Sequence, residues 1–266
     1  MIGSIVSLAK LCLVIVRKDE IGMSRKKLIF LDIDYTIYSD MLGVSKSAVE
    51  AIIKVRNNGH KIIFNTGRII SMLPKDILEL MPDGFITSAG AHVEVEDRCI
   101  QDHVMKRDDL CVICNYLTEK GISFELSSNT SIFQWNEADD IQKDAVNKIS
   151  YFDSEIPAIQ ISEDIGNYGN VIKSDCIINN RYSGEIFVKN INKATGIQAV
   201  LEYYSVNRED TIAFGDAPID FEMLQFAGIG VAMGNASQEI KQVADMVTKE
   251  YNNDGIYYGF AACKLL

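Results

Sequence analysis

Short apolar runs alternate with amphipathic stretches in the first 89 residues of the chain, and each apolar run ends in polar residues. A short continuous apolar run is typical of a buried strand, whereas apolar positions with a period of 3.6 indicate a helix. The segment from Ser45 to about Asn58 has this helical period, and Gly59 ends it. The pattern predicts strands at 28–33, 60–64 and 84–87 and helices at 45–58 and 69–81.

The pattern changes between residues 90 and 189, where short segments of alternating polarity predominate. Alternation with a period of two is typical of strands that are buried on one face only. It predicts strands at 92–96, 122–126 and 130–136, helices at 106–120 and 139–149, and a hairpin of strands 171–178 and 185–189. This part of the chain is therefore expected to form a separate α+β module.

The first pattern resumes after residue 190, with predicted helices at 193–205, 219–227 and 237–243 and predicted strands at 211–214 and 229–232. Alternating strands and helices favour a parallel sheet with right-handed crossovers. The predicted fold class is thus α/β: a Rossmann-like parallel-sheet core domain, residues 23–89 and 190–266, with an inserted α+β cap domain, residues 90–189. Residues 1–22 would be an N-terminal extension of unknown role.

The composition fits a globular protein that does not bind polyanions. The chain has 266 residues, of which 47% are hydrophobic, and its 26 Lys and Arg against 37 Asp and Glu give a net charge of -11. This charge disfavours attraction to nucleic acid or to an anionic membrane. An anionic substrate would therefore need a local cation.

A cytoplasmic location is expected. The apolar run from Ile2 to Val16 is broken by Lys10, lacks a basic leader, and is shorter than the roughly 20 residues that a membrane span needs. The six cysteines are scattered over a chain too large to need disulfide bonds, which favours a reducing compartment.

Candidate chemistry lies where the predicted parallel strands end. In an open parallel sheet, ligands bind beyond the carboxyl ends of the strands. The polar residues at these ends, and at the start of one helix, are Asp32, Asp34, Thr36, Thr66, Gly67, Arg68, Lys193, Asp216 and Asp220. Two carboxylates about 4 Å apart repel by roughly 4 kcal/mol at an effective dielectric constant of about 20, so a cation must offset them.

Hard oxygen ligands select Mg²⁺, which is usually held by one or two carboxylates together with a substrate phosphate. With Mg²⁺ present, Lys193 and the amides around Thr66 and Gly67 could hold a phosphate. An Asp oxygen could then attack phosphorus in line, and the second Asp could protonate the leaving oxygen.

These segments also resemble a known family. LDIDYT at 31–36, FNTGR at 64–68, INKATG at 191–196, and GDAPIDFEML at 215–224 followed by GVAMGNA resemble the four ordered motifs of the haloacid dehalogenase superfamily. Within it, the chain resembles the Cof-type phosphatases with a large C2-type cap. The resemblance covers about residues 26–89 and 190–255.

The resemblance implies a role for each matched residue. Asp32 would be the nucleophile that forms an aspartyl-phosphate, and Asp34 the general acid and base. Asp216 would bind Mg²⁺ together with Asp32 and the backbone carbonyl of Asp34, and Asp220 would be a ligand or the partner of one. The residues expected at the substrate are Thr66 and Lys193, which would hold the phosphoryl group, with Gly67, Arg68 and Asn235. Arg68 could contact either the substrate or a carboxylate across the cleft.

Four positions depart from the family pattern. Tyr35 stands where Gly is common, Ile219 where Asn is common, Ala194 where Gly often follows the lysine, and Ala89 where Asn often precedes Gly90. If the turn at Tyr35 needs a positive φ, a tyrosine there is strained. These departures bear on efficiency and substrate more than on the class of reaction.

The expected function is a Mg²⁺-dependent phosphatase for a small phosphorylated metabolite, with a sugar phosphate favoured, acting as a monomer or homodimer. Two alternatives stay open: a sugar phosphomutase of the same superfamily and a noncatalytic phosphate-binding protein.

Overall fold

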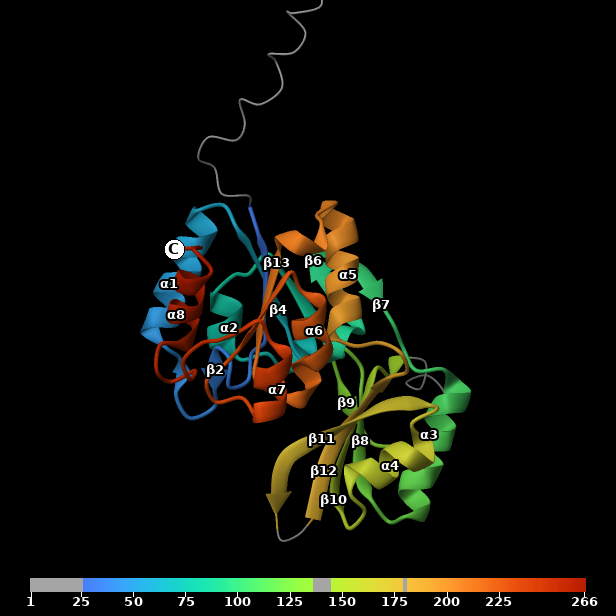
Figure 1. The fold of residues 1–266 in the computed structure, drawn as a ribbon. Helices are drawn as coiled ribbons and strands as arrows, with labels where there is room; N and C mark the ends of the chain where they lie inside the picture. Colours follow the sequence, from blue (N-terminus) through green and yellow to red (C-terminus); the bar gives the residue numbers. More distant parts are fainter. Residues whose placement is uncertain (1–25, 136–144, 179–180) are drawn as a thin grey trace, which may run out of the picture.

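The computed structural model describes residues 26–135, 145–178 and 181–266, which form two sheets with their covering helices (Figure 1). The first sheet has eight strands in the order β15-β14-β13-β1-β4-β5-β6-β7. Their bounds are β1 Leu28–Leu31, β4 Lys61–Asn65, β5 Gly84–Thr87, β6 His92–Val95, β7 Arg98–Asp102, β13 Thr211–Gly215, β14 Ile229–Ala232 and β15 Met246–Val247. β1 lies at the centre, parallel to both β13 and β4.

Helices cover both faces of this sheet, because successive side chains of the buried strands point to opposite faces. Ile29 and Leu31 pack with α1 and α8, and Phe30 packs with α5, α6 and α7. The helices of this domain are α1 Lys46–Asn57, α2 Lys75–Glu79, α5 Lys193–Tyr204, α6 Phe221–Phe226, α7 Gln238–Val243 and α8 Gly255–Ala262. A small hairpin, β2 Tyr38–Ser39 and β3 Gly43–Val44, follows β1. We call this unit the core domain.

The second sheet has five antiparallel strands in the order β11-β12-β10-β8-β9. Its elements are α3 Arg107–Glu119, β8 Ser123–Ser127, β9 Ile132–Phe133, β10 Lys148–Ser154, α4 Ala158–Ile165, β11 Gly169–Ile178 and β12 Arg181–Val188. Ile149 and Ile186 pack against apolar side chains of both helices, so α3 and α4 cover one face of the sheet. We call this unit the cap.

The predicted fold class is confirmed, and the helix at 45–58 begins as expected, with the Ser45 hydroxyl accepting a hydrogen bond from the amide of Ala48 (3.2 Å). The helix predicted at 69–81 is wrong in its extent. A 3₁₀ turn at Ile70–Met72 is followed by extended residues and only then by α2. Pro74 explains the break, because proline disfavours the helical conformation in the preceding residue and has no N–H to donate.

The predicted boundary between the core domain and the cap, at residue 90, does not coincide with the end of the core sheet. β6 pairs with β5 and β7 pairs with β6, both antiparallel, so residues up to Asp102 belong to the sheet of the core domain. The strand predicted at 92–96 alternates as the cap strands do and was therefore assigned to the cap, whereas β7 (RCIQD) has no such alternation and was not predicted.

The predicted hairpin at 171–178 and 185–189 is confirmed as β11 and β12, whereas β10 begins at Lys148, inside the helix predicted at 139–149. Most of that predicted helix lies outside the described residues, as does the extension 1–22. No helix in the described ranges is both long and apolar enough to cross a membrane.

Replacing Gly90 by Ala should destabilise the protein by about 3 kcal/mol, because a Cβ at Gly90 (φ +103°) would lie 2.1 Å from the carbonyl oxygen of Asn192. Gly121→Ala is the matched control, since Gly121 also has a positive φ (+66°) but nothing lies within 4 Å of a Cβ there. The control should cost only the backbone strain, about 1 kcal/mol. Urea unfolding of both variants tests this, and equal losses would contradict it.

Candidate active site

The carboxyl ends of β13, β1 and β4 lie side by side in the core sheet and bring the predicted polar residues together. Asp32 directly follows β1, Thr66 follows β4, and Asp216 follows β13. Parallel strands all end at the same edge, which explains why segments far apart in sequence meet here. We call this the catalytic edge.

Lys193, the first residue of α5, connects two carboxylates at the catalytic edge. Its ammonium group donates to Asp32 Oδ1 (2.5 Å) and to Asp220 Oδ1 (2.6 Å), and its side chain is completely buried. The start of α5 is fixed by Asn192, whose side chain accepts a hydrogen bond from the amide of Thr195 (3.0 Å). Asn65 donates to the carbonyl of Lys193 (3.1 Å). Hydrogen bonds at the ammonium group and at the backbone carbonyl thus fix the position of Lys193.

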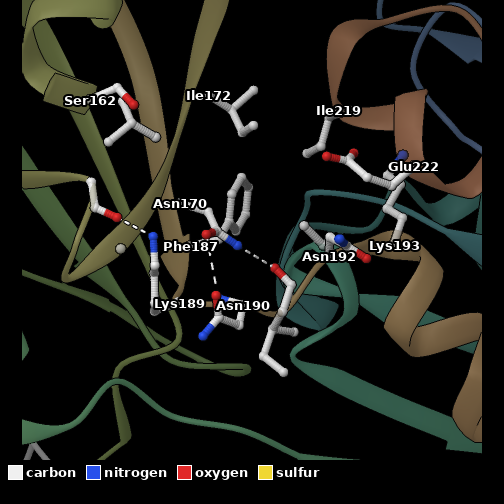
Figure 2. A pocket seen from close by; sticks show the side chains of 15 residues that line it. Ser162, Asn170, Ile172, Phe187, Lys189, Asn190, Asn192, Lys193, Ile219 and Glu222 are labelled. Carbon is white, nitrogen blue, oxygen red and sulfur yellow. Dashed lines mark hydrogen bonds between the residues drawn. The ribbon is translucent and has the colours of Figure 1, made fainter.

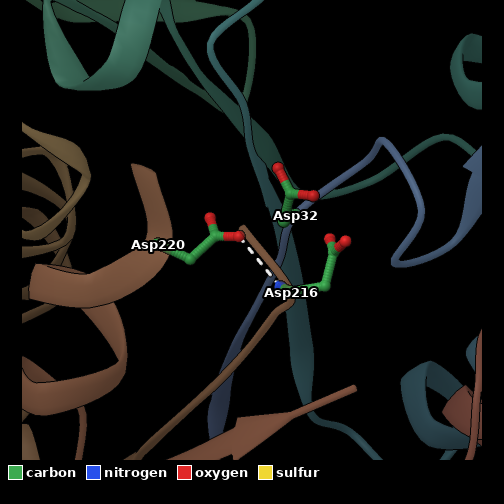
Figure 3. Close-up of side chains that lie close together, drawn as sticks. All are labelled: Asp32, Asp216 and Asp220. Atoms are coloured by element: carbon green, nitrogen blue, oxygen red, sulfur yellow. Dashed lines mark hydrogen bonds between the residues drawn. The ribbon is translucent and has the colours of Figure 1, made fainter. Parts of the chain in front are cut away.

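Asp32, Asp216 and Asp220 lie close together (Figure 3), but Asp216 and Asp220 have different hydrogen-bond partners. Each oxygen of Asp220 already accepts hydrogen bonds: Oδ1 from Lys193, and Oδ2 from the amides of Asp216 (2.9 Å) and Ala217 (3.0 Å). Asp216 accepts only from neutral groups, the Thr36 hydroxyl (3.0 Å) and the Asn235 side-chain amide (3.1 Å). Asp220 therefore orients Lys193 and the loop, whereas Asp216 has no cationic partner among the described residues.

The site contains more carboxylates than cations. Burial and the neighbouring Asp220 raise the pKa of Asp32 well above its usual range, although Lys193 opposes the shift. The same two causes raise the pKa of Asp216 to about 7. Burial alone would lower the pKa of Lys193, but Asp220 and Asp32 outweigh it and the pKa is raised. The lysine is therefore an ammonium ion, and the three carboxylates still lack positive charge.

A divalent cation would supply the positive charge that this site lacks. Asp32, Asp216 and Asp220 each offer a ligand oxygen, and these three atoms lie within 4.8 Å of one another. Because both oxygens of Asp220 are already engaged, Asp32 and Asp216 are the two carboxylates best able to hold an ion. Two carboxylates, with room left for water and phosphate, are the protein ligands that Mg²⁺ commonly takes.

The carboxylate of Asp34 lies outside this three-aspartate group. It forms a bidentate ion pair with Arg68, with Nε to Oδ2 at 2.8 Å and Nη2 to Oδ1 at 2.6 Å. Arg68 also approaches Asp40 (3.7 Å) and donates to the carbonyl of Met72 (3.2 Å). Of the two alternatives for Arg68, the structure shows the contact with a carboxylate.

Thr66 and Gly67 form the side of the catalytic edge that meets the cap. Thr66 is buried, and its hydroxyl accepts a hydrogen bond from the amide of Arg68 (3.1 Å). A Cβ placed on Gly67 would lie 3.1 Å from Ile219 Cδ1, 3.4 Å from Glu185 Oε2 and 3.5 Å from Phe187 Cζ. Glycine thus lets the cap approach the loop that carries Thr66.

Tyr35 has a φ of +56°, so the turn does place a tyrosine in the left-handed region. Asn235 donates to its carbonyl (3.0 Å), and the Tyr35 ring packs edge-on against Tyr251, with ring centroids 5.6 Å apart. Because Asn235 also binds Asp216, it ties the turn after Asp34 to the loop of Asp216. Ala89 likewise has a positive φ (+53°).

A cavity of about 350 Å³ lies between the cap and the core domain beside Lys193 (Figure 2). Its core side includes Asn192, Ile219 and Glu222, and its cap side includes Asn170, Ile172 and Phe187. Tyr35 is not among the lining residues, so it does not border this cavity.

The sequence reasoning missed the cap residues that reach the site, Glu185 and Phe187, and the supporting residue Asn65. Asn65 lies within the FNTGR segment and could have been found there. The two cap residues carry no motif, and only the strand pairing places them.

The chain is similar to known proteins over most of its length. It belongs to the haloacid dehalogenase-like hydrolase family, whose model matches residues 29–165 and 130–260. The Cof-type resemblance predicted from the motifs is thereby confirmed.

Relatives matched over nearly their whole length carry phosphatase names. The 5-amino-6-(5-phospho-D-ribitylamino)uracil phosphatase YitU of Bacillus subtilis is 28% identical over 262 residues, covering 86% of this chain and 94% of the relative. A phosphoglycolate phosphatase of Nitrosopumilus maritimus is 26% identical, with 87% and 94% covered. The structure of BT1666 from Bacteroides thetaiotaomicron, described among phosphatases of the superfamily, has a TM-score of 0.79 at 26% identity, with 91% and 96% covered.

The affinity for Mg²⁺ should fall by about tenfold or more between pH 8 and pH 6. A carboxylate must lose its proton to bind a metal, and Asp216, with its pKa raised to about 7, becomes protonated over this range. Titration calorimetry of the metal-free protein at the two pH values measures the change. An Asp216→Asn variant should bind Mg²⁺ weakly at both pH values; a pH-independent affinity of the unaltered protein would contradict the prediction.

Proposed function

We propose that this protein is a Mg²⁺-dependent phosphatase that hydrolyses a small phosphorylated metabolite, with a sugar phosphate favoured, through an aspartyl-phosphate on Asp32. One observation carries the proposal: Lys193 holds Asp32 at the catalytic edge beside Thr66, and the three-aspartate group there lacks positive charge. A site that only bound phosphate would gain nothing from carboxylates, which repel the anion.

The first step would use Asp32 as the nucleophile. One of its oxygens attacks phosphorus while the bond between phosphorus and the ester oxygen breaks. Lys193 already donates to Asp32, so it orients the attacking carboxylate and stabilises charge on the phosphoryl oxygens. The Thr66 hydroxyl and the amides of its loop hold the remaining oxygens.

Asp34 would move the protons. When substrate displaces Arg68, Asp34 would take up a proton from solvent and give it to the leaving oxygen as the ester bond breaks. In the second step it takes a proton from the water that attacks the aspartyl-phosphate, and the bond between Asp32 and phosphorus breaks. The ion pair with Arg68 keeps the Asp34 side chain fixed until substrate arrives.

Mg²⁺, held by Asp32 and Asp216 with the backbone carbonyl of Asp34, would neutralise the phosphoryl oxygens. Hydrogen bonds from Thr36 and Asn235 fix the side chain of Asp216, and Asp220 accepts a hydrogen bond from the Asp216 amide and so fixes the loop. These contacts position Asp216 as a metal ligand. Asp220 is thus proposed as the partner of Lys193 and of the loop rather than as a ligand.

The substrate class follows from the relatives and from the cap. Two relatives are named for small phosphorylated metabolites, a ribityl phosphate and phosphoglycolate. The cavity of about 350 Å³ beside Lys193 is large enough for a metabolite, and residues of the cap line one side of it. We further propose a cytoplasmic protein, monomeric or homodimeric, which does not bind nucleic acid or membrane.

An Asp32→Asn variant should release inorganic phosphate at least about a thousandfold more slowly than the unaltered protein, because it lacks the attacking oxygen. A screen of phosphorylated metabolites in Mg²⁺, with this variant as the blank, measures the difference. Excess chelator should abolish turnover of the unaltered protein.

Two other outcomes would contradict the proposal. Full turnover in excess chelator would exclude the metal-dependent mechanism. An isomerised sugar phosphate in place of free phosphate would identify a mutase instead.

A further inference from the structure

A series of polar side chains connects the core domain to the cap beside Ser88. The Ser88 hydroxyl donates to Asn147 Oδ1 (3.1 Å), and the Asn147 side-chain amide donates to Asn129 Oδ1. The Asn129 side-chain nitrogen in turn lies 2.9 Å from both His92 Nδ1 and Asp102 Oδ1. The two asparagines belong to the cap, whereas the serine, the histidine and the aspartate belong to the core domain. The series therefore crosses between the domains at both of its ends.

The core end of this series supports the loop that carries Thr66. The amide of Ser88 donates to the carbonyl of Arg68 (2.8 Å), and Ser88 is completely buried. Further along the same loop, the amide of Ser71 donates to the carbonyl of Asn129 (3.3 Å). The position of the cap and the position of this catalytic loop are therefore coupled.

The ring of His92 has one nitrogen with a fixed role and one whose role depends on its charge. Nε2 lies 2.9 Å from Glu94 Oε1, so Nε2 carries a proton, because a bare ring nitrogen would repel the carboxylate. Nδ1 has two neighbours: the Asn129 nitrogen, which is a donor, and Asp102 Oδ1 at 3.2 Å, which is an acceptor. The neutral ring thus accepts from Asn129, whereas the protonated ring donates to Asp102.

The groups that contact the ring come from three elements. Glu94 lies on β6 and Asp102 on β7, and both are carboxylates, whereas the cap contributes the uncharged Asn129. The thiol of Cys99, also on β7, lies 3.9 Å from Nδ1. Burial and the neighbouring Asp102 raise the pKa of this thiol, so it stays uncharged below pH 8. Histidine is the side chain whose charge ordinarily changes between pH 5 and pH 8.

A rotation of the Asn129 amide would not restore the contact with a protonated ring. Its oxygen would then take the place of the nitrogen that lies 2.9 Å from Asp102 Oδ1, and the two oxygens would repel each other. Its nitrogen would also face the N–H group that Asn147 now donates. Without rotation, the Asn129 N–H group faces the N–H of Nδ1 and has no acceptor there.

We infer that His92 is a positioning residue for the cap. Its neutral form holds Asn129, and with it the cap, against the loop that carries Thr66, and its protonation releases Asn129. The closed arrangement of cap and loop is therefore favoured at high pH and weakened at low pH. This movement does not require catalysis, whereas its effect on KM rests on the phosphatase function proposed above.

Long-range ¹H–¹⁵N NMR spectra of the metal-free protein between pH 5 and pH 8 test the inference directly. The chain has three histidines, His60, His92 and His103, and a His92→Asn variant identifies the signals of His92. The neutral ring should carry its proton on Nε2. As Nδ1 takes up a proton, the backbone amide signals of Asn129 and Asn147 should shift with the same midpoint. A neutral ring with its proton on Nδ1, or cap amides that do not follow the ring, would overturn the inference.

The His92→Asn variant also tests the cause of the transition. Its side-chain oxygen can take the place of Nδ1 as acceptor for Asn129 and stays uncharged, so the cap amides should lose the transition. His103→Asn is the matched control, because His103 is exposed, and it should keep the transition. A transition that persists in His92→Asn would overturn the inference.

Kinetics with p-nitrophenyl phosphate, with Mg²⁺ saturating at each pH, measure the effect on the proposed reaction. The KM of the unaltered protein, divided by that of His92→Asn, should rise from within about twofold of unity at pH 8 to about threefold higher at pH 5.5. Other titrating groups act on both proteins and cancel in this ratio, and a purely structural role would change it equally at both pH values. A constant ratio would overturn the positioning role. No phosphate release at all would overturn the proposed function and leave the NMR test of the cap in force.

Discussion

The organisation of the catalytic edge depends on one buried ammonium group. Lys193 joins Asp32 and Asp220, which follow two neighbouring strands, and it comes from a helix that packs on one face of the same sheet. Three carboxylates in so small a volume would otherwise repel one another or take up protons. The lysine offsets part of this charge and leaves a deficit at Asp32 and Asp216. In the proposed mechanism, attack by Asp32 and binding of Mg²⁺ both depend on this same excess of negative charge.

Much of this edge could be predicted from the sequence, because its signals are local. Asp32, Thr66 and Asp216 each lie at or just after the end of a predicted strand, and parallel strands place such residues at one edge. The helix cap at Ser45 and the start of α5 at Lys193 are local signals of the same kind. The sequence also indicated that Tyr35 would be strained if its turn needed a positive φ, and the turn has one.

What could not be predicted depends on pairing between distant segments. The strand β6 alternates as the cap strands do, and only the pairing of β6 with β5 and of β7 with β6 assigns both strands to the sheet of the core domain. Lys148 and Glu185 belong to neighbouring strands of the cap sheet, and no spacing in the sequence indicates that they form an ion pair or that Glu185 approaches Gly67. The pairing of Asp34 with Arg68 was one of two open alternatives for the same reason, since a side chain's partner is chosen by geometry in three dimensions.

The separation of Asp32 and Lys193 by 161 residues has a consequence for synthesis. β1 hydrogen-bonds to β4 on one side and to β13 on the other, so a growing chain that ends before residue 211 lacks one neighbour of its central strand. The cap, by contrast, is continuous in sequence and can pair all its strands once residue 188 is available. As the chain leaves the ribosome, the cap can therefore fold before the catalytic edge. The hydrogen bond between Lys193 and Asp32 forms only afterwards.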